Sequence, residues 1–330
     1  MIRFARWLLA TFVLAATALA GGLMLFTWRT ARRVEAALPA RGRFIDIDGA
    51  RLHYVDGGAG EGAGPAIVLI HGLGGQLMNF PADSLEPLRR DYRVIALDRP
   101  GSGYSTRPAG ASAALGAQAA TIAGFIRALG LERPLVVGHS LGGAVALAVA
   151  LEHPESVGGL ALISPLTQVH DTAPVMLRGL AIRSSLVRRV VAWTLATPAS
   201  VRNHELVMPM LFGPDAVPAD FPIRGGGLLS LRPSSFYAAS SDMVAVNEDL
   251  PGLVSRYGSI TVPVGILYGT GDRVLDSVAN GTAMLEAIPG LDLELIENGG
   301  HMTPITAPAH TEAFIRRMAG KIAAANGKPP

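Results

Sequence analysis

The chain has 330 residues, of which 49% are hydrophobic, 16% are charged and none is cysteine. This composition excludes a disordered protein, and the lack of cysteine excludes disulfide scaffolds, cysteine-ligated zinc, iron–sulfur clusters and thiol nucleophiles. The formal net charge is +2, but seven arginines and one acidic residue lie within residues 1–43, which leaves 21 basic and 25 acidic residues elsewhere. The slightly acidic main body argues against a nucleic-acid partner.

The first predicted element is an apolar run from Trp7 to Trp28 that contains no charged residue. As a helix it would be roughly 33 Å long, enough to cross a hydrocarbon core of about 30 Å. A cleaved signal peptide is the alternative, because Ala18-Leu19-Ala20 fits a cleavage site. Cleavage there would leave the apolar segment GGLMLF at the new terminus, so the sequence favours a retained single-pass anchor.

Residues 1–42 are therefore predicted to form an N-terminal membrane anchor, with a transmembrane helix over 7–28 and then a basic juxtamembrane linker. Five arginines follow the apolar run by residue 43, whereas two precede it. Because basic residues favour the cytoplasmic side, this excess weakly favours a cytoplasmic catalytic body. The arginine-rich composition indicates a bacterial source, and hence the inner membrane.

The segment after the anchor begins with a predicted β-hairpin, in which RFIDID and RLHYVD alternate polar and apolar residues around Gly49-Ala50. Short apolar runs without alternation follow, separated by loops and helical stretches. Such runs are typical of strands buried on both faces of a parallel sheet. They are AIVLI (66–70), RVIAL (93–97), PLVVG (134–138) and GLALI (159–163).

This strand pattern stops after Ser164-Pro165, and residues 166–258 contain amphipathic helical stretches and loops rich in proline and glycine. It resumes with strands near 262–269 and 291–297, separated by a helix near 276–287 and followed by a helix near 307–324. We therefore predict an α/β core of residues 43–165 and 259–324. Residues 166–258 would be an inserted helical lid, and 325–330 a flexible tail.

A G-x-S-x-G sequence, Gly138-His139-Ser140-Leu141-Gly142, lies between a predicted buried strand and a helical run. A serine on so sharp a strand-to-helix turn needs glycines two positions away on either side, because any side chain there would clash with the turn. The turn exposes the hydroxyl at the carboxyl edge of the sheet. Ser140 is therefore the predicted nucleophile.

A serine nucleophile needs a base and a carboxylate that orients the base, in the chain order serine, acid, histidine on this type of sheet. Asp272 follows the strand VGILYG in a turn, whereas nearby Asp276 resembles a helix cap. His301 follows a strand and a double-glycine loop, and His310 lies within the last predicted helix. The sequence thus predicts Asp272 as the acid and His301 as the general base.

An oxyanion hole would complete the site, because acyl transfer places negative charge on the former carbonyl oxygen. One donor is predicted to be the backbone N–H of Leu141, which follows the nucleophile. The second is predicted to be the N–H of Leu73, in the glycine-rich loop HGLGG that follows the strand AIVLI.

With these motifs in place, the chain resembles the α/β-hydrolase superfamily, within its lid-bearing serine hydrolases: esterases, monoacylglycerol lipases, haloperoxidase-like enzymes and carbon–carbon bond hydrolases. The resemblance spans residues 43–324. The matching stretches are HGLGG (71–75), DRPGSGYS (98–105), GHSLGG (138–143), YGTGDRVL (268–275) and NGGH (298–301). It implies a mostly parallel sheet with one antiparallel strand near the hairpin, and a structural role for Asp98. Serine at the elbow argues against relatives that open epoxides or remove halide with aspartate.

The resulting hypothesis is a membrane-anchored hydrolase that cleaves apolar or lipid-like carboxylic esters through an acyl-enzyme, without metal or organic cofactor. Apolar lid residues suit an apolar substrate, although a lid also needs a core of its own. Four lid arginines, Arg178, Arg183, Arg188 and Arg189, are expected either on lipid headgroups or on a solvated face. The alternatives are a carbon–carbon bond or amide hydrolase, a haloperoxidase-like enzyme and, least favoured, a non-catalytic scaffold.

Overall fold

The computed structural model describes residues 2–58, 64–169 and 175–325. Its centre is an eight-stranded sheet in the order β1-β2-β4-β3-β5-β6-β7-β8. Only β2 runs antiparallel to its neighbours, and all other pairs are parallel. The strands are β1 (Arg43–Ile47), β2 (Ala50–Gly58), β3 (Ile67–Ile70), β4 (Arg93–Leu97), β5 (Leu135–His139), β6 (Gly159–Ile163), β7 (Val264–Gly269) and β8 (Asp292–Ile296). The predicted hairpin, parallel strands and single antiparallel strand are confirmed.

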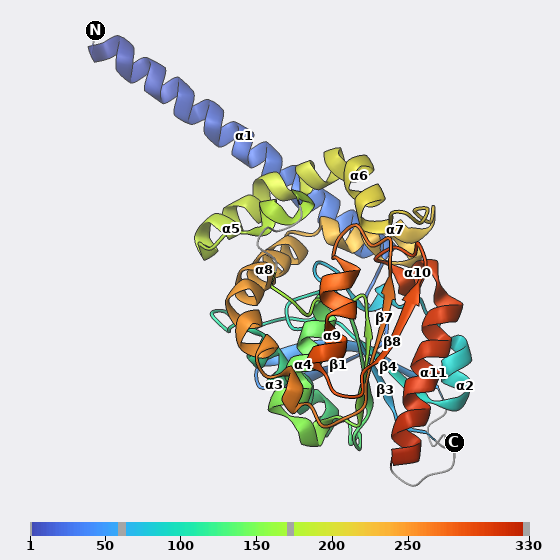
Figure 1. Cartoon of the computed structure of the whole chain (residues 1–330). Coiled ribbons are helices and arrows are strands. Elements are labelled where there is room, and N and C mark those ends of the chain that lie inside the picture. Colours follow the sequence, from blue (N-terminus) through green and yellow to red (C-terminus); the bar gives the residue numbers. More distant parts are fainter. Residues whose placement is uncertain (1, 59–63, 170–174, 326–330) are drawn as a thin grey trace.

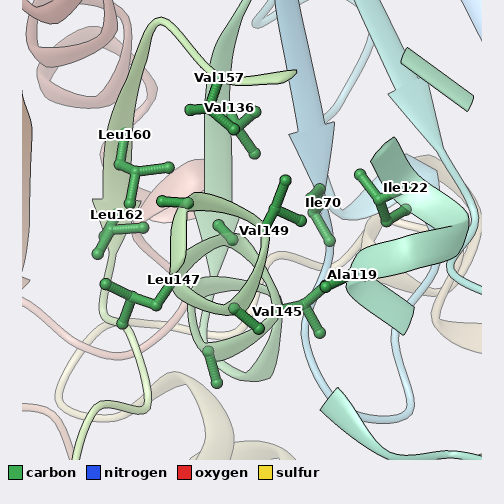
Figure 2. Packing of buried hydrophobic residues seen from close by; sticks show 14 of the residues in the cluster. Ile70, Ala119, Ile122, Val136, Val145, Leu147, Val149, Val157, Leu160 and Leu162 are labelled. Carbon is green, nitrogen blue, oxygen red and sulfur yellow. The ribbon is translucent and has the colours of Figure 1, made fainter. Parts of the chain in front are cut away.

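Helices cover both faces of the sheet (Figure 1). One face packs on α3 (Leu115–Ala128) and α4 (Leu141–Glu152), and the other on α2 (Glu86–Asp91) and α11 (Pro308–Ala325). Figure 2 shows the first face, where Val145 and Val149 of α4 meet strand residues such as Ile70 and Val136. Because alternate strand residues point to opposite faces, Ile67 and Leu69 lie on the second face, in the core that α2 and α11 cover. The unbroken apolar runs therefore correspond to strands buried on both sides.

Between β6 and β7 the described residues form helices and turns, in the segment that the sequence assigns to a lid. In chain order these elements are η3 (Val175–Leu180), α5 (Ser185–Val191), the π-helix η4 (Ala192–Ala196), α6 (Thr197–Phe212), α7 (Phe221–Arg224), η5 (Gly227–Leu231), α8 (Pro233–Val254) and η6 (Tyr257–Ser259). The remaining short elements are η1 (Leu77–Asn79), η2 (Pro154–Ser156), the π-helix η7 (Val278–Thr282), α9 (Met284–Ala287) and α10 (Thr303–Thr306). The single helix expected near 276–287 is thus two short pieces, η7 and α9. Residues 326–330 of the predicted tail lie outside the described residues.

The N-terminal helix α1 (Ile2–Ala37) projects away from the globular body and is longer than the predicted 7–28. Among the described residues, its segment Arg3–Ala37 is the one helix long and apolar enough to cross a membrane. The segment predicted as a basic linker is helical as far as Ala37.

The last turns of α1 pack on the lid rather than standing free. Its side chains at 27, 31, 34 and 38 are buried, and Val34 and Leu38 form a cluster with Leu229 of η5. Their spacing of four, three and four residues places them on one helical face. This apolar face explains why the helix continues past the last hydrophobic residue of the predicted span.

Candidate active site

Ser140 lies between the end of β5 and the start of α4, in the strained backbone conformation φ 54°, ψ −123°. The flanking glycines are required there. A Cβ on Gly138 would lie 2.4 Å from the Gly142 carbonyl oxygen, and one on Gly142 would lie 2.3 Å from the Ile70 carbonyl oxygen. The glycines therefore let the strand turn sharply into the helix, with Ser140 at its tip.

Asp272 and His301 meet although 29 residues separate them, with Asp272 Oδ2 2.7 Å from His301 Nδ1. Asp272 follows β7, and its Oδ1 accepts hydrogen bonds from the Val274 and Leu275 amides at 2.7 and 3.0 Å. Both side chains are nearly or fully buried. Because a carboxylate accepts hydrogen bonds, His301 Nδ1 is the donor, which leaves Nε2 as the basic nitrogen of the neutral ring.

His139 is a neighbour of this pair that sequence reasoning did not single out. Its Nε2 donates to the His301 carbonyl oxygen at 3.0 Å, and the two rings lie 5.0 Å apart. Burial, and then the nearby His301, lower the pKa of His139 to about 3. His139 is therefore neutral at pH 7, and it fixes the backbone of His301 without competing for a proton.

The glycine-rich loop 71–75 borders Ser140 closely. A Cβ on Gly72 would lie 2.9 Å from the Ser140 Cβ, so this position requires glycine. Within the described ranges, the backbone amides of Leu73 and Leu141 donate to no protein acceptor. Leu73 lies in this loop and Leu141 directly follows Ser140, and these are the two positions at which the sequence predicts the donors of an oxyanion hole.

Ser140 and His301 line one cavity of about 300 Å³, together with Gly72, Leu73 and His139. Its other wall comes from the predicted lid segment. The apolar side chains of that wall are Val207, Met208, Leu211, Phe221, Pro222, Leu228 and Leu231. Ser200 and His204 of α6 add polar groups, and both are largely exposed, which places them at the mouth of the cavity.

The sequence-based view of the lid needs three corrections. His204 lines the cavity, which the sequence did not predict, because an exposed histidine on a helix carries no signal of its own. The expectation that apolar lid residues suit an apolar substrate holds for only some of them: Met208 lines the cavity, whereas Trp193 lies on the surface and Phe212 lies in a small core. Arg188 is buried and donates to Ser240, Ser241 and the Ile182 carbonyl oxygen, so it rests neither on headgroups nor in solvent.

The other titratable side chains weighed from the sequence lie away from the cavity. Asp98 accepts hydrogen bonds from the Leu77 and Tyr104 amides and from His53. These bonds hold three segments of the chain together. Asp276 accepts from the Ala279 amide at 2.7 Å, as a helix cap does. His310 is exposed on α11, and residue 170, also a histidine, lies outside the described residues. Among the residues that the structure describes, no cluster of three or more His, Cys, Asp or Glu could hold a metal ion.

Comparisons with known proteins match this architecture. A sequence model of the family described as "alpha/beta hydrolase fold" matches residues 65–308. The chain is 41% identical over 286 residues to the dihydrolipoyllysine-residue acetyltransferase component of the acetoin cleaving system of Cupriavidus necator, covering 84% of this chain and 69% of that protein. It is 30% identical over 271 residues to 2-hydroxy-6-oxononadienedioate/2-hydroxy-6-oxononatrienedioate hydrolase 2 of Pseudomonas putida, covering 81% and 89%. A solved membrane phospholipase A has a TM-score of 0.64 at 26% identity, covering 96% of this chain and 99% of that chain.

Proposed function

The chain belongs to the α/β-hydrolase family, and we propose that it is a membrane-anchored serine hydrolase that cleaves apolar carboxylic esters. The observation that carries this proposal is the shared cavity: Ser140 on its strained turn and His301, held by Asp272, line the same space. The esterase and lipase structures that share the fold support an ester substrate.

The proposed chemistry follows from the protonation of His301. The Ser140 hydroxyl attacks the ester carbonyl carbon while His301 Nε2 accepts its proton, and the backbone N–H groups of Leu73 and Leu141 stabilise the oxyanion. The intermediate then collapses, and the imidazolium gives its proton to the departing alkoxide. Water attacks the acyl-Ser140 bond by the same route, which releases the acid and restores the hydroxyl.

The cavity favours an apolar acyl or alcohol group. Seven apolar lid side chains line the cavity that Ser140 borders, and none of the described lining residues is lysine or arginine. Burial of apolar surface contributes about 25 cal/mol per Å², so such walls bind hydrocarbon well and leave a charged group unpaired.

The N-terminal helix supports attachment to a membrane, since Arg3–Ala37 is long enough to span one. The lid adds a second apolar surface beside it. Leu186, Val190 and Trp193 are exposed at helical spacing on α5 and η4, and α1 packs on η4. We therefore place the mouth of the cavity near the bilayer, where lipid-like esters concentrate. A membrane phospholipase A with the same fold is in keeping with this arrangement.

A carbon–carbon bond hydrolase is the second candidate, because the Pseudomonas putida relative is named for two dioate substrates. A dianionic substrate would need cationic partners in the cavity. Since the described lining residues include no lysine or arginine, the cavity supports an ester better than a dicarboxylate.

The test is activity-based labelling of the full-length protein in detergent. A fluorophosphonate should label the wild-type chain at Ser140, and Ser140→Ala should abolish labelling while lowering kcat by at least about 10⁴-fold. Ser255→Ala, which changes an exposed serine at the end of α8, serves as the matched control and should label normally. Turnover of p-nitrophenyl esters should rise with acyl length. A folded wild-type protein that never labels, or that cleaves a vinylogous diketone and no ester, contradicts the proposal.

A further inference from the structure

Arg99 is a fully buried cation at the back of the glycine-rich loop. Its Nε donates to the His71 carbonyl oxygen and its Nη2 to the Gly72 carbonyl oxygen, both at 2.9 Å. A buried charge is costly unless it is paired and its donors are satisfied. Two of the donor nitrogens of Arg99 are therefore satisfied by carbonyl oxygens of the loop beside Ser140.

The Gly72 carbonyl oxygen receives three donors. In addition to Arg99 Nη2, it accepts from His71 Nδ1 at 2.8 Å and from the Gly75 amide at 3.3 Å. The C=O and N–H groups of one trans peptide point in opposite directions, so holding the Gly72 oxygen also sets the direction of the Leu73 N–H. Hydrogen bonds to the carbonyl polarise the peptide and strengthen its N–H as a donor.

His71 completes this arrangement as a neutral ring. Its Nε2 accepts from the Arg99 backbone N–H at 2.9 Å, so its Nδ1 carries the proton that is donated to Gly72. Burial, followed by the charge of Arg99, lowers the pKa of His71 to about 4. The loop is thus fixed at pH 7 by one imidazole and one guanidinium.

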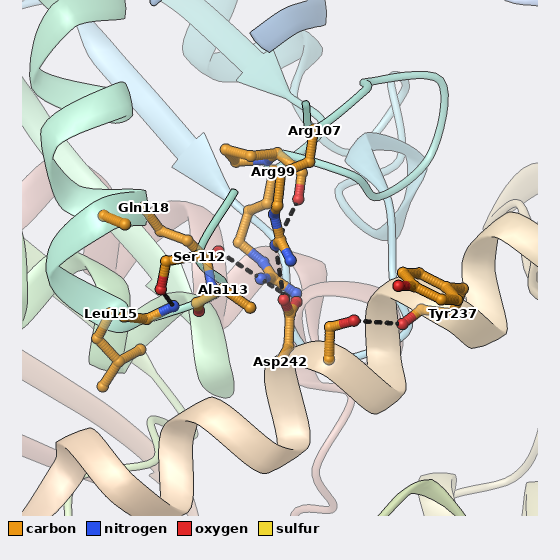
Figure 3. A network of polar contacts seen from close by, with 12 residues as sticks. Arg99, Arg107, Ser112, Ala113, Leu115, Gln118, Tyr237 and Asp242 are labelled. Atoms are coloured by element: carbon orange, nitrogen blue, oxygen red, sulfur yellow. Dashed lines mark hydrogen bonds and ion pairs between the residues drawn. The ribbon is translucent and has the colours of Figure 1, made fainter. Parts of the chain in front are cut away.

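The remaining nitrogen of Arg99 faces the lid segment, as Figure 3 shows. Arg99 Nη1 lies 2.7 Å from Asp242 Oδ2 on α8 and 2.8 Å from Gln118 Oε1 on α3. The other Asp242 oxygen accepts from Arg107 Nη2 at 2.7 Å. Asp242 is itself fully buried, so each of its carboxylate oxygens is paired with one arginine.

We propose that Arg99 is a positioning residue for ester hydrolysis: it orients and polarises the Gly72–Leu73 peptide as an oxyanion donor, and Asp242 ties that orientation to helix α8 of the lid. The inference rests on the proposed function. It adds a physical link between the lid and the chemical step, because the Arg99 guanidinium bonds both Asp242 of α8 and the carbonyl oxygens of the loop beside Ser140.

The experiment compares three single variants of the full-length protein on one p-nitrophenyl ester. Arg99→Lys keeps the charge but cannot reach two carbonyls and a carboxylate at once, and it should lower kcat about 10–100-fold with KM changed less than threefold, since one oxyanion donor is typically worth 10²–10³-fold. Asp242→Asn keeps the shape of the lid residue, and it should lower kcat about tenfold. Arg107→Gln removes the other ion pair of Asp242 without touching the loop, and its kcat should stay within about threefold of wild type.

A second readout separates positioning from general damage. Inhibition by a trifluoromethyl ketone, which forms a tetrahedral oxyanion on serine, should weaken in parallel with kcat in Arg99→Lys, whereas binding of an uncharged amide analogue should not change. Unchanged kcat in Arg99→Lys, or an equal loss in Arg107→Gln, overturns the role of Arg99. If Arg99→Lys does not fold, Asp242→Asn decides, and an unchanged kcat there overturns the inference. Wild-type labelling of Ser140 reports on the proposed function separately: an active wild type with an unaffected variant overturns only the role of Arg99.

Discussion

The helices α4 and α1 each contain an uncharged apolar stretch, but their side chains lie in opposite surroundings. In α4 all ten residues from Leu141 to Ala150 are buried against the sheet and its neighbours. In α1 the large apolar side chains before Thr27 are mostly exposed, including Trp7, Phe12 and Leu14. Hydropathy alone therefore does not distinguish a core helix from a membrane helix.

Length and side-chain size make the difference. The 12 residues of α4 give a helix of about 18 Å, too short for a bilayer, whereas the 36 residues of α1 give about 54 Å. Glycine and alanine predominate in α4 and allow close approach to strands on either side. On α1, large apolar side chains such as Trp7, Phe12 and Leu14 are exposed, which suits a lipid solvent. Helix α4 directly follows the proposed nucleophile Ser140, and α1 is proposed to attach the protein to a membrane.

The largest expected effect comes from placing the same charge in both helices. Ala146→Arg inserts a cation at a position with no solvent exposure, and it should prevent folding, because an unpaired buried charge costs more than the whole stability of a domain. Ala15→Arg changes an exposed position of α1. It should leave circular dichroism and hydrolysis of a short, soluble ester unchanged.

Ala15→Arg should still reduce the share of the protein that is found in the membrane. An arginine at the centre of a membrane helix costs about 2.5–3.5 kcal/mol on insertion scales, so Ala15→Arg should move a measurable share of the protein out of the membrane fraction. If Ala15→Arg unfolds the body, or if Ala146→Arg folds normally, the contrast between the two helices is wrong.

Sequence motifs predicted the sheet, the elbow and the Asp272–His301 pair, because each depends on a local pattern: an apolar run, a glycine spacing, or a turn after a strand. The contacts they missed join distant segments. Arg99 and Asp242 are 143 residues apart, and Asp242 lies on a helix without a motif. The contact of His139 with His301 spans 162 residues. The packing of α1 on the lid had a signal, the spacing of 27, 31, 34 and 38, but its partner surface could not be read from the chain.

The second test uses pH, because His71 and His139, beside the start of α4, are both buried. The folded-state pKa values of His71 and His139, about 4 and about 3, lie below the ordinary value of 6.5, so the unfolded chain binds protons first as the pH falls. The contribution of these two neutral imidazoles to the free energy of unfolding is fully present above pH 6.5 and is lost as the pH falls toward 4. Between pH 7 and 5 each imidazole should lower the free energy of unfolding by about 2 kcal/mol.

Urea denaturation of wild type and His139→Gln at both pH values isolates this effect. The variant should lose about 2 kcal/mol less than wild type over this range, because Gln does not titrate. His310→Gln alters an exposed histidine on α11 and should keep the wild-type slope. Equal slopes for wild type and His139→Gln would show that His139 is not held neutral by burial.

The smallest expected effect concerns the other helix, where α1 meets the lid. Val34 is 4% exposed and packs beside Leu38 and Leu229, whereas Val13 is 52% exposed on the same helix. Val34→Ala removes two buried methyl groups, worth about 1–2 kcal/mol, from the contact that holds α1 to the lid and not from the sheet core. Trypsin should therefore cut after Arg41, in the exposed connection to β1, roughly tenfold faster in Val34→Ala, while Val13→Ala should be cut at the wild-type rate. Equal rates in the two variants would mean that α1 joins the body only through the chain, and the lid would then have no fixed position relative to the membrane.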